Sequence, residues 1–392
     1  VLARYYGPEI FGQFTFALTL TTSFIFLADF GFDILLTTEL ARNKDNSIQI
    51  FQQLFSLKLV FTFIAVIGMW LFAFLFDLSN TSQVLILILS LYLVFSTLTN
   101  FLNALFKGYE RLELETKVSF VSNIGLMVFA VMLISLHANV VLIAISFFVS
   151  KAIGFVIGLK YSFKLLEGIK FKLIFSDFKK IKGKMFVFGI HFLFNYLYFQ
   201  IDTIILAVMK GDYYVGIYQA AFKLIALALV LPEILNNALL PALSRLNVEN
   251  IVQWKKAGYL MNKILLIIGL PISIVFFVYA EQIIHFVYGS KNYLEAIPVL
   301  RLFSIVLIIR LSLEAYSLML TTSDRQKIRM WVVLGATIIN VTINIFLVPK
   351  FGVLAVAIVA VLTNGLVLLM YSSVTYPLFK EWTLNRSTIS II

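Results

Sequence analysis

The sequence predicts an all-α integral membrane protein made of two six-helix bundles arranged as a parallel repeat. Composition is the first of three observations that predict this fold class: 61 % of the residues are apolar, 13 % are charged, and the mean hydropathy is +0.98. Soluble globular proteins contain far more charge. The second observation is a series of long apolar runs, and the third is a weak internal repeat.

Eleven apolar runs are long enough to cross a bilayer, which takes roughly 20 helical residues. We expect the spanning helices near residues 12–36, 52–76, 83–106, 117–136, 138–160, 185–209, 214–243, 257–280, 295–320, 328–348 and 352–379. Little chain remains for a soluble domain. Pro232, Pro241 and Pro271 lie inside these runs and should bend or break them.

The longest polar connection, residues 161–184, carries seven lysines and divides the chain almost in half. We therefore expect an N-terminal bundle at residues 1–160, a basic cytoplasmic linker at 161–184 and a C-terminal bundle at 185–392. An odd number of helices would leave the two chain ends on opposite sides of the membrane. We expect a first helix before Val1 that this sequence lacks, so that the N-terminal bundle begins with the end of helix 1.

The net charge of +11 reflects membrane topology. Every second loop, beginning with residues 42–50, lies on one side of the predicted membrane. These loops and the C-terminal tail together carry 21 of the 31 basic residues, whereas the loops on the other side carry 4. This asymmetry is typical of cytoplasmic loops in multi-pass proteins of the cell membrane. Polybasic loops beside helices meet anionic lipid headgroups, so we expect membrane lipids as partners and no nucleic acid.

The internal repeat appears when the sequence is compared with itself at an offset of 204 positions. Gly7 then aligns with Gly211, and Gly12 with Gly216. In the sequence around these glycines, apolar residues align with apolar residues and polar residues with polar ones. Six helices separate the two copies, so both copies have the same orientation across the membrane. The layout is that of a transporter with two lobes related about the membrane normal.

Polar side chains form stripes on three of the predicted helices. His191, Asn195, Tyr198 and Asp202 are spaced 4, 3 and 4 residues apart, which places them on one narrow face. Such a stripe faces protein or water. Hydrogen bonding between packed helices and the lining of a cavity both remain open for the uncharged members, and His191 is either a packed histidine or a proton carrier.

Full charges inside the spans are harder to explain by packing, because each costs roughly 2.5–3.5 kcal/mol at mid-bilayer. We therefore expect functional roles for Lys151, Lys223, Arg310 and Asp202. Arg310 and Glu314, four residues apart, are expected to pair. Lys58 and Lys263 lie near helix ends, where we expect their side chains to reach the headgroups.

Three stretches resemble polysaccharide flippases, the Wzx-type branch of the MOP superfamily, which also holds the MATE exporters and the lipid II flippase. They are "ARYYGPEIFGQFTFALTL…DFGFDILLTTELAR", "YFQIDTIILAVMKGDYYVGIYQAAFKLIALALVLPEILNNALLPALSR" and "YLEAIPVLRLFSIVLIIR". The resemblance extends over the whole chain in helix order, loop polarity and repeat. It implies a MATE-like fold whose two bundles rock between inward and outward states.

The resemblance also implies the cargo, a polyprenyl-diphosphate-linked oligosaccharide moved from the cytoplasmic to the outer leaflet for surface polysaccharide synthesis. Cationic side chains would hold the diphosphate: Arg4 and Arg301 match arginines of the family, and Lys151, Lys223 and Arg310 come from the charge argument above. Coupling to a cation gradient, H⁺ or Na⁺, would use ion-coupling or cavity residues. These candidates are Asp29, Asp33, His191, Asn195, Asp202, Glu233 and Glu314.

Two alternatives stay open. A MATE-like multidrug or cation exporter would need a cavity lined with carboxylates and aromatic rings, whereas six cationic residues lie inside the predicted helices here. An integral-membrane polysaccharide polymerase usually carries a long external loop with catalytic residues, and the longest external connection here is near residues 281–294. We expect no enzyme activity, no cofactor and no metal site, and other membrane proteins of polysaccharide assembly as further partners.

Overall fold

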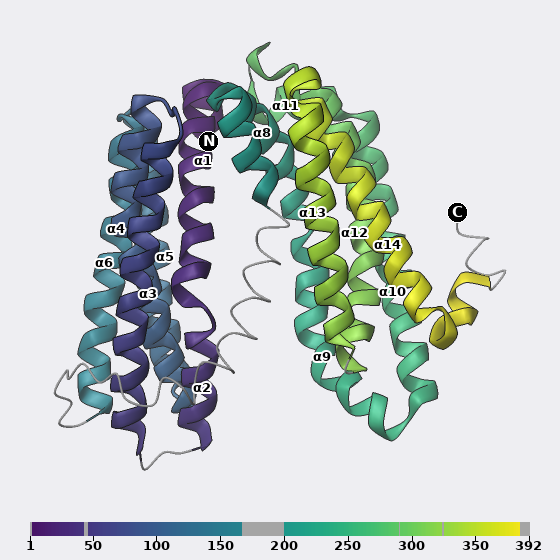
Figure 1. The fold of residues 1–392 in the computed structure, drawn as a ribbon, viewed down its shortest axis with the longest axis horizontal. Helices are drawn as coiled ribbons and strands as arrows, with labels where there is room; N and C mark the ends of the chain where they lie inside the picture. The colour runs from purple at the N-terminus through teal and green to yellow at the C-terminus, as the bar shows by residue number, and fades with distance from the viewer. Residues whose placement is uncertain (1, 43–45, 167–199, 290, 324, 385–392) are drawn as a thin grey trace. The chain divides into compact units, whose positions relative to one another are not determined.

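The computed structural model describes residues 2–42, 46–166, 200–289, 291–323 and 325–384, and all secondary structure assigned within them is helical (Figure 1). Ten helices or helix pairs in this part of the chain are long and apolar enough to span a membrane. They cover every predicted run except residues 185–209, most of which lie outside the described ranges. The predicted class, an all-α membrane protein, is confirmed.

The contacts divide the chain into two compact units. The first comprises residues 1–6 and 13–200, and the second comprises residues 7–12 and 201–392. Helix α1 (Leu2–Asp29) therefore contributes its residues 7–12 to the second unit and the rest to the first.

The first unit contains most of α1 together with five further helices. They are α2 (Phe32–Arg42), α3 (Ser47–Leu75), α4 (Asn80–Gly108), α5 (Leu112–Ser135) and α6 (Val140–Leu165). Helix α4 is central, because it packs against α2, α3, α5 and α6. The outer helices present apolar side chains outward, as Phe74 of α3 does with 86 % exposure. Such a surface suits contact with lipid.

The second unit has the corresponding arrangement around α12 (Ala296–Thr322). Its described helices also include the helical segment 201–210, α8 (Asp212–Ala228), α9 (Val230–Glu249), α10 (Ile251–Val278), α11 (Ala280–Tyr288), α13 (Gln326–Phe351) and α14 (Val353–Leu384), with a short 3₁₀ turn η2 at Lys291–Tyr293. Helix α12 packs against α8, α9, α10 and α14. In both α4 and α12, 56 % of the most apolar stretch is buried, so each unit is built around one central helix.

Two predicted spans are interrupted. The run at 12–36 divides between α1 and α2 at Phe30 and Gly31, both with positive φ, 39° and 86°. The run at 214–243 divides between α8 and α9 at Leu229, just ahead of Pro232. Helices α9 and α10 continue through Pro241 and Pro271.

The aligned glycines of the repeat adopt the same backbone conformation. Gly7 has φ 76° and ψ 177°, and Gly211 has φ 89° and ψ 179°, a combination open mainly to glycine. Within the second unit, residues 7–12 then pack against α8: a Cβ on Gly12 would lie 1.8 Å from the Asp212 carbonyl oxygen. A Cβ on Gly216 would lie 1.9 Å from the Pro8 carbonyl oxygen, which makes the contact reciprocal.

We expect Gly216→Ala to destabilise the protein by about 1–3 kcal/mol, because the new methyl group meets backbone atoms that cannot move aside. Thermal unfolding of the purified protein in detergent measures this loss. Gly335→Ala is the matched control, since a Cβ there meets nothing within 4 Å. Equal melting temperatures for the two variants would contradict the close contact.

Candidate functional site

A buried ion cluster joins the first three helices. The Lys58 side chain, on α3, is 0 % exposed, and its Nζ lies 2.6 Å from Asp29 Oδ1 and 2.9 Å from Asp33 Oδ1. The rings of Phe32 and Phe101 have their centroids 6.0 and 5.7 Å from the same nitrogen. One lysine is thus held by two carboxylates and two aromatic faces.

This cluster lies at the interruption between α1 and α2. Helix α1 ends at Asp29, and the positive φ of Gly31 lets the chain restart as α2. The backbone N–H of Asp33 donates a hydrogen bond to Asp29 Oδ1 at 3.3 Å, so Asp29 stabilises the new helix start. The expectation that Lys58 extends to the headgroups is wrong, because two carboxylates inside the bundle satisfy its charge.

A second buried network lies in the second unit around Asp202, which is 5 % exposed and belongs to the helical segment 200–210. The Tyr218 hydroxyl of α8 donates to Asp202 Oδ2 at 3.0 Å. The Asn344 amide of α13 donates to Asp202 Oδ1 at 3.0 Å and lies equally close to Asn340 Oδ1. Arg310, 8 % exposed on α12, lies within electrostatic reach of the carboxylate.

Two buried amide oxygens, one in this network and one on the residue after Tyr218, lack a hydrogen-bond donor within the described residues. Asn344 Oδ1 and Gln219 Oε1 have no partner among the described residues, while the Gln219 amide nitrogen donates to Thr203 Oγ1 at 2.7 Å. A carboxylate with amide and hydroxyl oxygens is the donor set that hard cations prefer. Rotation of the Asn344 amide would replace its donor nitrogen by its oxygen, which would then face a cation bound at Asp202.

The sequence interpretation missed Tyr218, Asn340 and Asn344. A signal for the two asparagines was present, because they lie four residues apart in the apolar run at 328–348 and so share one helix face. Tyr218 carried no such signal, since tyrosine is common in packed helices without any polar role.

The remaining carboxylates have different surroundings. Glu314 of α12, expected to pair with Arg310, accepts a hydrogen bond from the Asn236 amide of α9 at 2.6 Å. Glu233 is exposed near the start of α9. His191 and Asn195 lie outside the described residues and remain predictions.

The cationic candidates occupy three kinds of place. Arg4 and Arg301 are exposed near the starts of α1 and α12, whereas Arg310 is buried beside Asp202. Lys151, half-buried on α6, and Lys223, exposed in the middle of α8, make no side-chain hydrogen bond or ion pair within the described part of the chain. These two lysines remain available to an anionic ligand.

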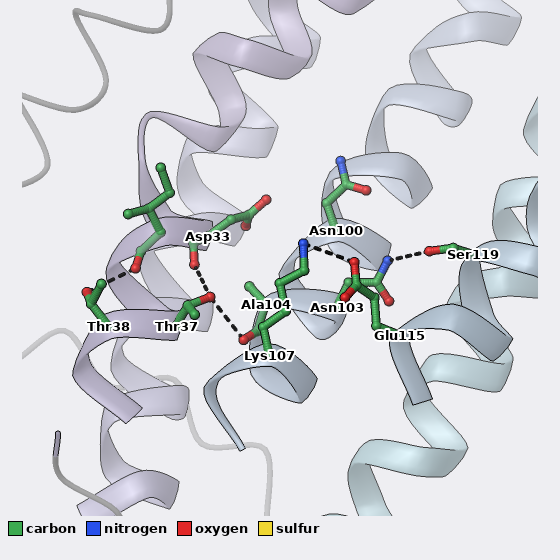
Figure 2. A pocket seen from close by; sticks show the side chains of 10 residues that line it. Asp33, Thr37, Thr38, Asn100, Asn103, Ala104, Lys107, Glu115 and Ser119 are labelled. Atoms are coloured by element: carbon green, nitrogen blue, oxygen red, sulfur yellow. Dashed lines mark hydrogen bonds and ion pairs between the residues drawn. The ribbon is translucent and has the colours of Figure 1, made fainter. Parts of the chain in front are cut away.

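Asp33 also borders a cavity of about 450 Å³ formed by α2, α4 and α5 in the first unit (Figure 2). Eight of its ten lining residues are polar or charged, the exceptions being Ile34 and Ala104. Lys107 and Glu115 form an ion pair at 2.9 Å beside it. The sequence interpretation included Asp33 but none of the other polar residues of this cavity.

Comparison with known families gives two matches. A family model described as polysaccharide biosynthesis protein matches residues 1–247, and one described as MatE matches residues 188–347. No curated protein matches the chain.

Solved structures share the fold. A multidrug resistance MATE family transporter of the MOP superfamily, in its inward-facing conformation, has a TM-score of 0.74 and 14 % identity, covering 97 % of this chain and 96 % of that one. The lipid II flippase MurJ, inward closed, has a TM-score of 0.76 and 17 % identity, covering 98 % and 86 %. A MOP superfamily transporter from Pyrococcus furiosus has a TM-score of 0.61 and 14 % identity, covering 97 % and 88 %. The MATE-like fold is thereby confirmed.

We expect Lys58→Met to destabilise the first unit by about 3–5 kcal/mol, because it leaves two buried carboxylates without their counter-ion. Thermal unfolding in detergent measures the loss. Lys263→Met is the control, since Lys263 is half-buried on α10 and its side chain makes no ion pair within the described residues. Asp29→Asn and Asp33→Asn, added together to Lys58→Met, should restore much of the stability; no recovery would contradict the ionic interpretation.

Proposed function

We propose that this chain, which belongs to the polysaccharide biosynthesis protein family, is a flippase for a lipid-linked oligosaccharide. It would move a polyprenyl-diphosphate-linked oligosaccharide from the cytoplasmic to the outer leaflet of the cell membrane by alternating access. The family match and the fold shared with a lipid II flippase support a transporter role rather than an enzymatic one.

The two available lysines carry this proposal. Lys151 on α6 and Lys223 on α8 lie inside apolar helices, and their side chains have no anionic partner within the described ranges. An unpaired ammonium in a span costs free energy, so its presence favours a transported anion as the missing partner. A diphosphate supplies concentrated negative charge for this role. Arg4 and Arg301, both exposed, are proposed to contribute at the helix ends.

A MATE-like exporter of organic cations is the second candidate, supported by the MatE match over residues 188–347. Lysines without counter-ions oppose it, because they repel a cationic cargo. A polysaccharide polymerase is less favoured still, since both family matches and the structural likenesses are to transporter folds.

The Asp202 network is proposed to couple transport to a cation gradient. Neutral donors, Tyr218 and Asn344, hold the carboxylate, and the nearby amide oxygens suit a small cation. A charge that moves across 100 mV changes the free energy by roughly 2.3 kcal/mol, enough to drive resetting of an empty carrier. The buried position of Arg310 favours a role in this network over direct contact with the diphosphate.

We expect Lys223→Ala and Lys151→Ala each to slow transfer of a labelled polyprenyl-diphosphate oligosaccharide across proteoliposomes by about ten- to a hundredfold. Loss of one charge-assisted contact is worth roughly 1.5–3 kcal/mol. Lys263→Ala, at a half-buried lysine of α10, should leave the rate unchanged. Melting temperatures check that all three variants fold. Efflux of cationic dyes without movement of the lipid would overturn the flippase proposal.

We expect Asp202→Asn to abolish the stimulation of transfer by an imposed Na⁺ or H⁺ gradient, because the variant no longer carries the charge that binds the cation. The measurement compares initial rates with and without each gradient. Asp77→Asn, at an exposed aspartate between α3 and α4, is the control. Equal stimulation of the Asp202→Asn variant and the wild type would remove Asp202 from the coupling site.

A further inference from the structure

The cavity between α2, α4 and α5 has surplus hydrogen-bond acceptors. Thr37 Oγ1 lies 2.9 Å from the Asp33 carbonyl oxygen and 3.1 Å from that of Ala104, and Thr38 Oγ1 lies 3.0 Å from that of Ile34. A hydroxyl has one proton, so donation to the backbone leaves only the lone pairs of each threonine for a ligand. Figure 2 shows both hydroxyls on the α2 side of the cavity.

Asn103 of α4 adds an acceptor at the opposite wall. It is 9 % exposed, its amide nitrogen donates to Ser119 Oγ at 3.2 Å, and its Oδ1 is buried with no partner among the residues that the structure describes (Figure 2). A buried oxygen without a donor costs free energy until a ligand or water supplies one. The cavity is therefore suited to a ligand that carries several O–H groups.

The charges of the lining exclude a phosphate. Lys107 is its one lining cation, and Glu115 neutralises it at 2.9 Å. Asp33 adds a carboxylate that is bonded to Lys58 through Oδ1. No aromatic ring lines the cavity, so a flat organic cation would find nothing to stack on. The volume of about 450 Å³ lies within the range of roughly 300–1,000 Å³ typical of small-ligand sites.

We propose that this cavity is a saccharide subsite that binds sugar units of the lipid-linked cargo through their hydroxyl groups. The inference rests on the proposed flippase function and adds a location for sugar recognition, separate from the lysines assigned to the diphosphate. Lys107 and Glu115 lie at the end of α4 and the start of α5, the side that the basic loops predict to be cytoplasmic. The protein would therefore bind the sugar on the cytoplasmic side, before transfer.

A thiol-protection experiment tests occupancy directly, because the chain contains no cysteine. Asn100→Cys places one thiol on the exposed part of the cavity wall, and Thr116→Cys places one on α5 outside it. Each full-length variant, in nanodiscs, is labelled with a polar maleimide alone, with polyprenyl-diphosphate oligosaccharide, or with polyprenyl diphosphate that lacks sugar. At about ten times its Kd, the oligosaccharide lipid should slow labelling of Asn100→Cys about tenfold.

The controls separate the sugar from the diphosphate. Labelling of Thr116→Cys should not change, and the sugar-free lipid should protect neither thiol. Equal protection of Asn100→Cys by both lipids would overturn the proposal, as would no protection by either. Protection by a cationic dye in place of the oligosaccharide would overturn it in favour of an exporter.

Substitutions then test the effect on transport. Thr38→Leu fills the cavity at an exposed threonine, and Thr116→Leu is matched to it, because both hydroxyls donate to the carbonyl four residues earlier. Thr38→Leu should raise the concentration of oligosaccharide lipid needed for half-maximal transfer about tenfold, and Thr116→Leu should not. If the wild type transfers the lipid and both variants need the same concentration for half-maximal transfer, only the saccharide subsite is overturned. If the wild type transfers no oligosaccharide lipid, the proposed flippase function itself is overturned.

Discussion

The constraint on which the first unit depends is that a charge fully buried in a membrane helix must find stabilising partners within the protein. Lys58 meets this requirement with Asp29 and Asp33, and the three side chains come from three consecutive helices. The pairing lies at the break in the first predicted span: Asp29 ends α1, Asp33 lies in the first turn of α2, and the turn at Phe30 and Gly31 separates them.

The second unit meets the same constraint differently. Asp202 has neutral donors around it, from Tyr218 and Asn344, with Arg310 within electrostatic reach. Hydrogen bonds from amides and hydroxyls stabilise a carboxylate without cancelling its charge. A carboxylate 2.6 Å from a lysine loses most of its attraction for a cation. Hydrogen bonds from neutral groups leave that attraction in place at Asp202, where the field of Arg310 reduces it. On this physical ground we assign the proposed coupling role to Asp202 rather than to Asp29.

The sequence predicted the helices and the membrane class well, because apolar length and loop charge are local properties that lipid imposes on every span. It predicted the contacts poorly. Because Lys58 is near a helix end, its side chain was expected to reach the headgroups. Its partners lie on other helices, and only tertiary packing brings them together. Pro232 is a sequence signal for the break at Leu229. The break at Phe30 has only Gly31 as a signal, and glycines also occur inside helices that are not broken. Whether a buried aspartate is paired with a lysine or held by amide and hydroxyl groups also depends on distances between helices, which residue spacing along the sequence does not give.

Asp33 belongs both to the ion cluster and to the lining of the proposed saccharide subsite. Oδ1 lies 2.9 Å from Lys58 Nζ, and the Asp33 side chain also hydrogen-bonds with that of Asp29, so a sugar hydroxyl would add to contacts that the carboxylate already makes. A ligand would then add a hydrogen bond to the carboxylate without displacing the lysine. Binding of sugar would stabilise the α2 wall in the position that the ion cluster already sets, so recognition at this end of the first unit requires no rearrangement of its core.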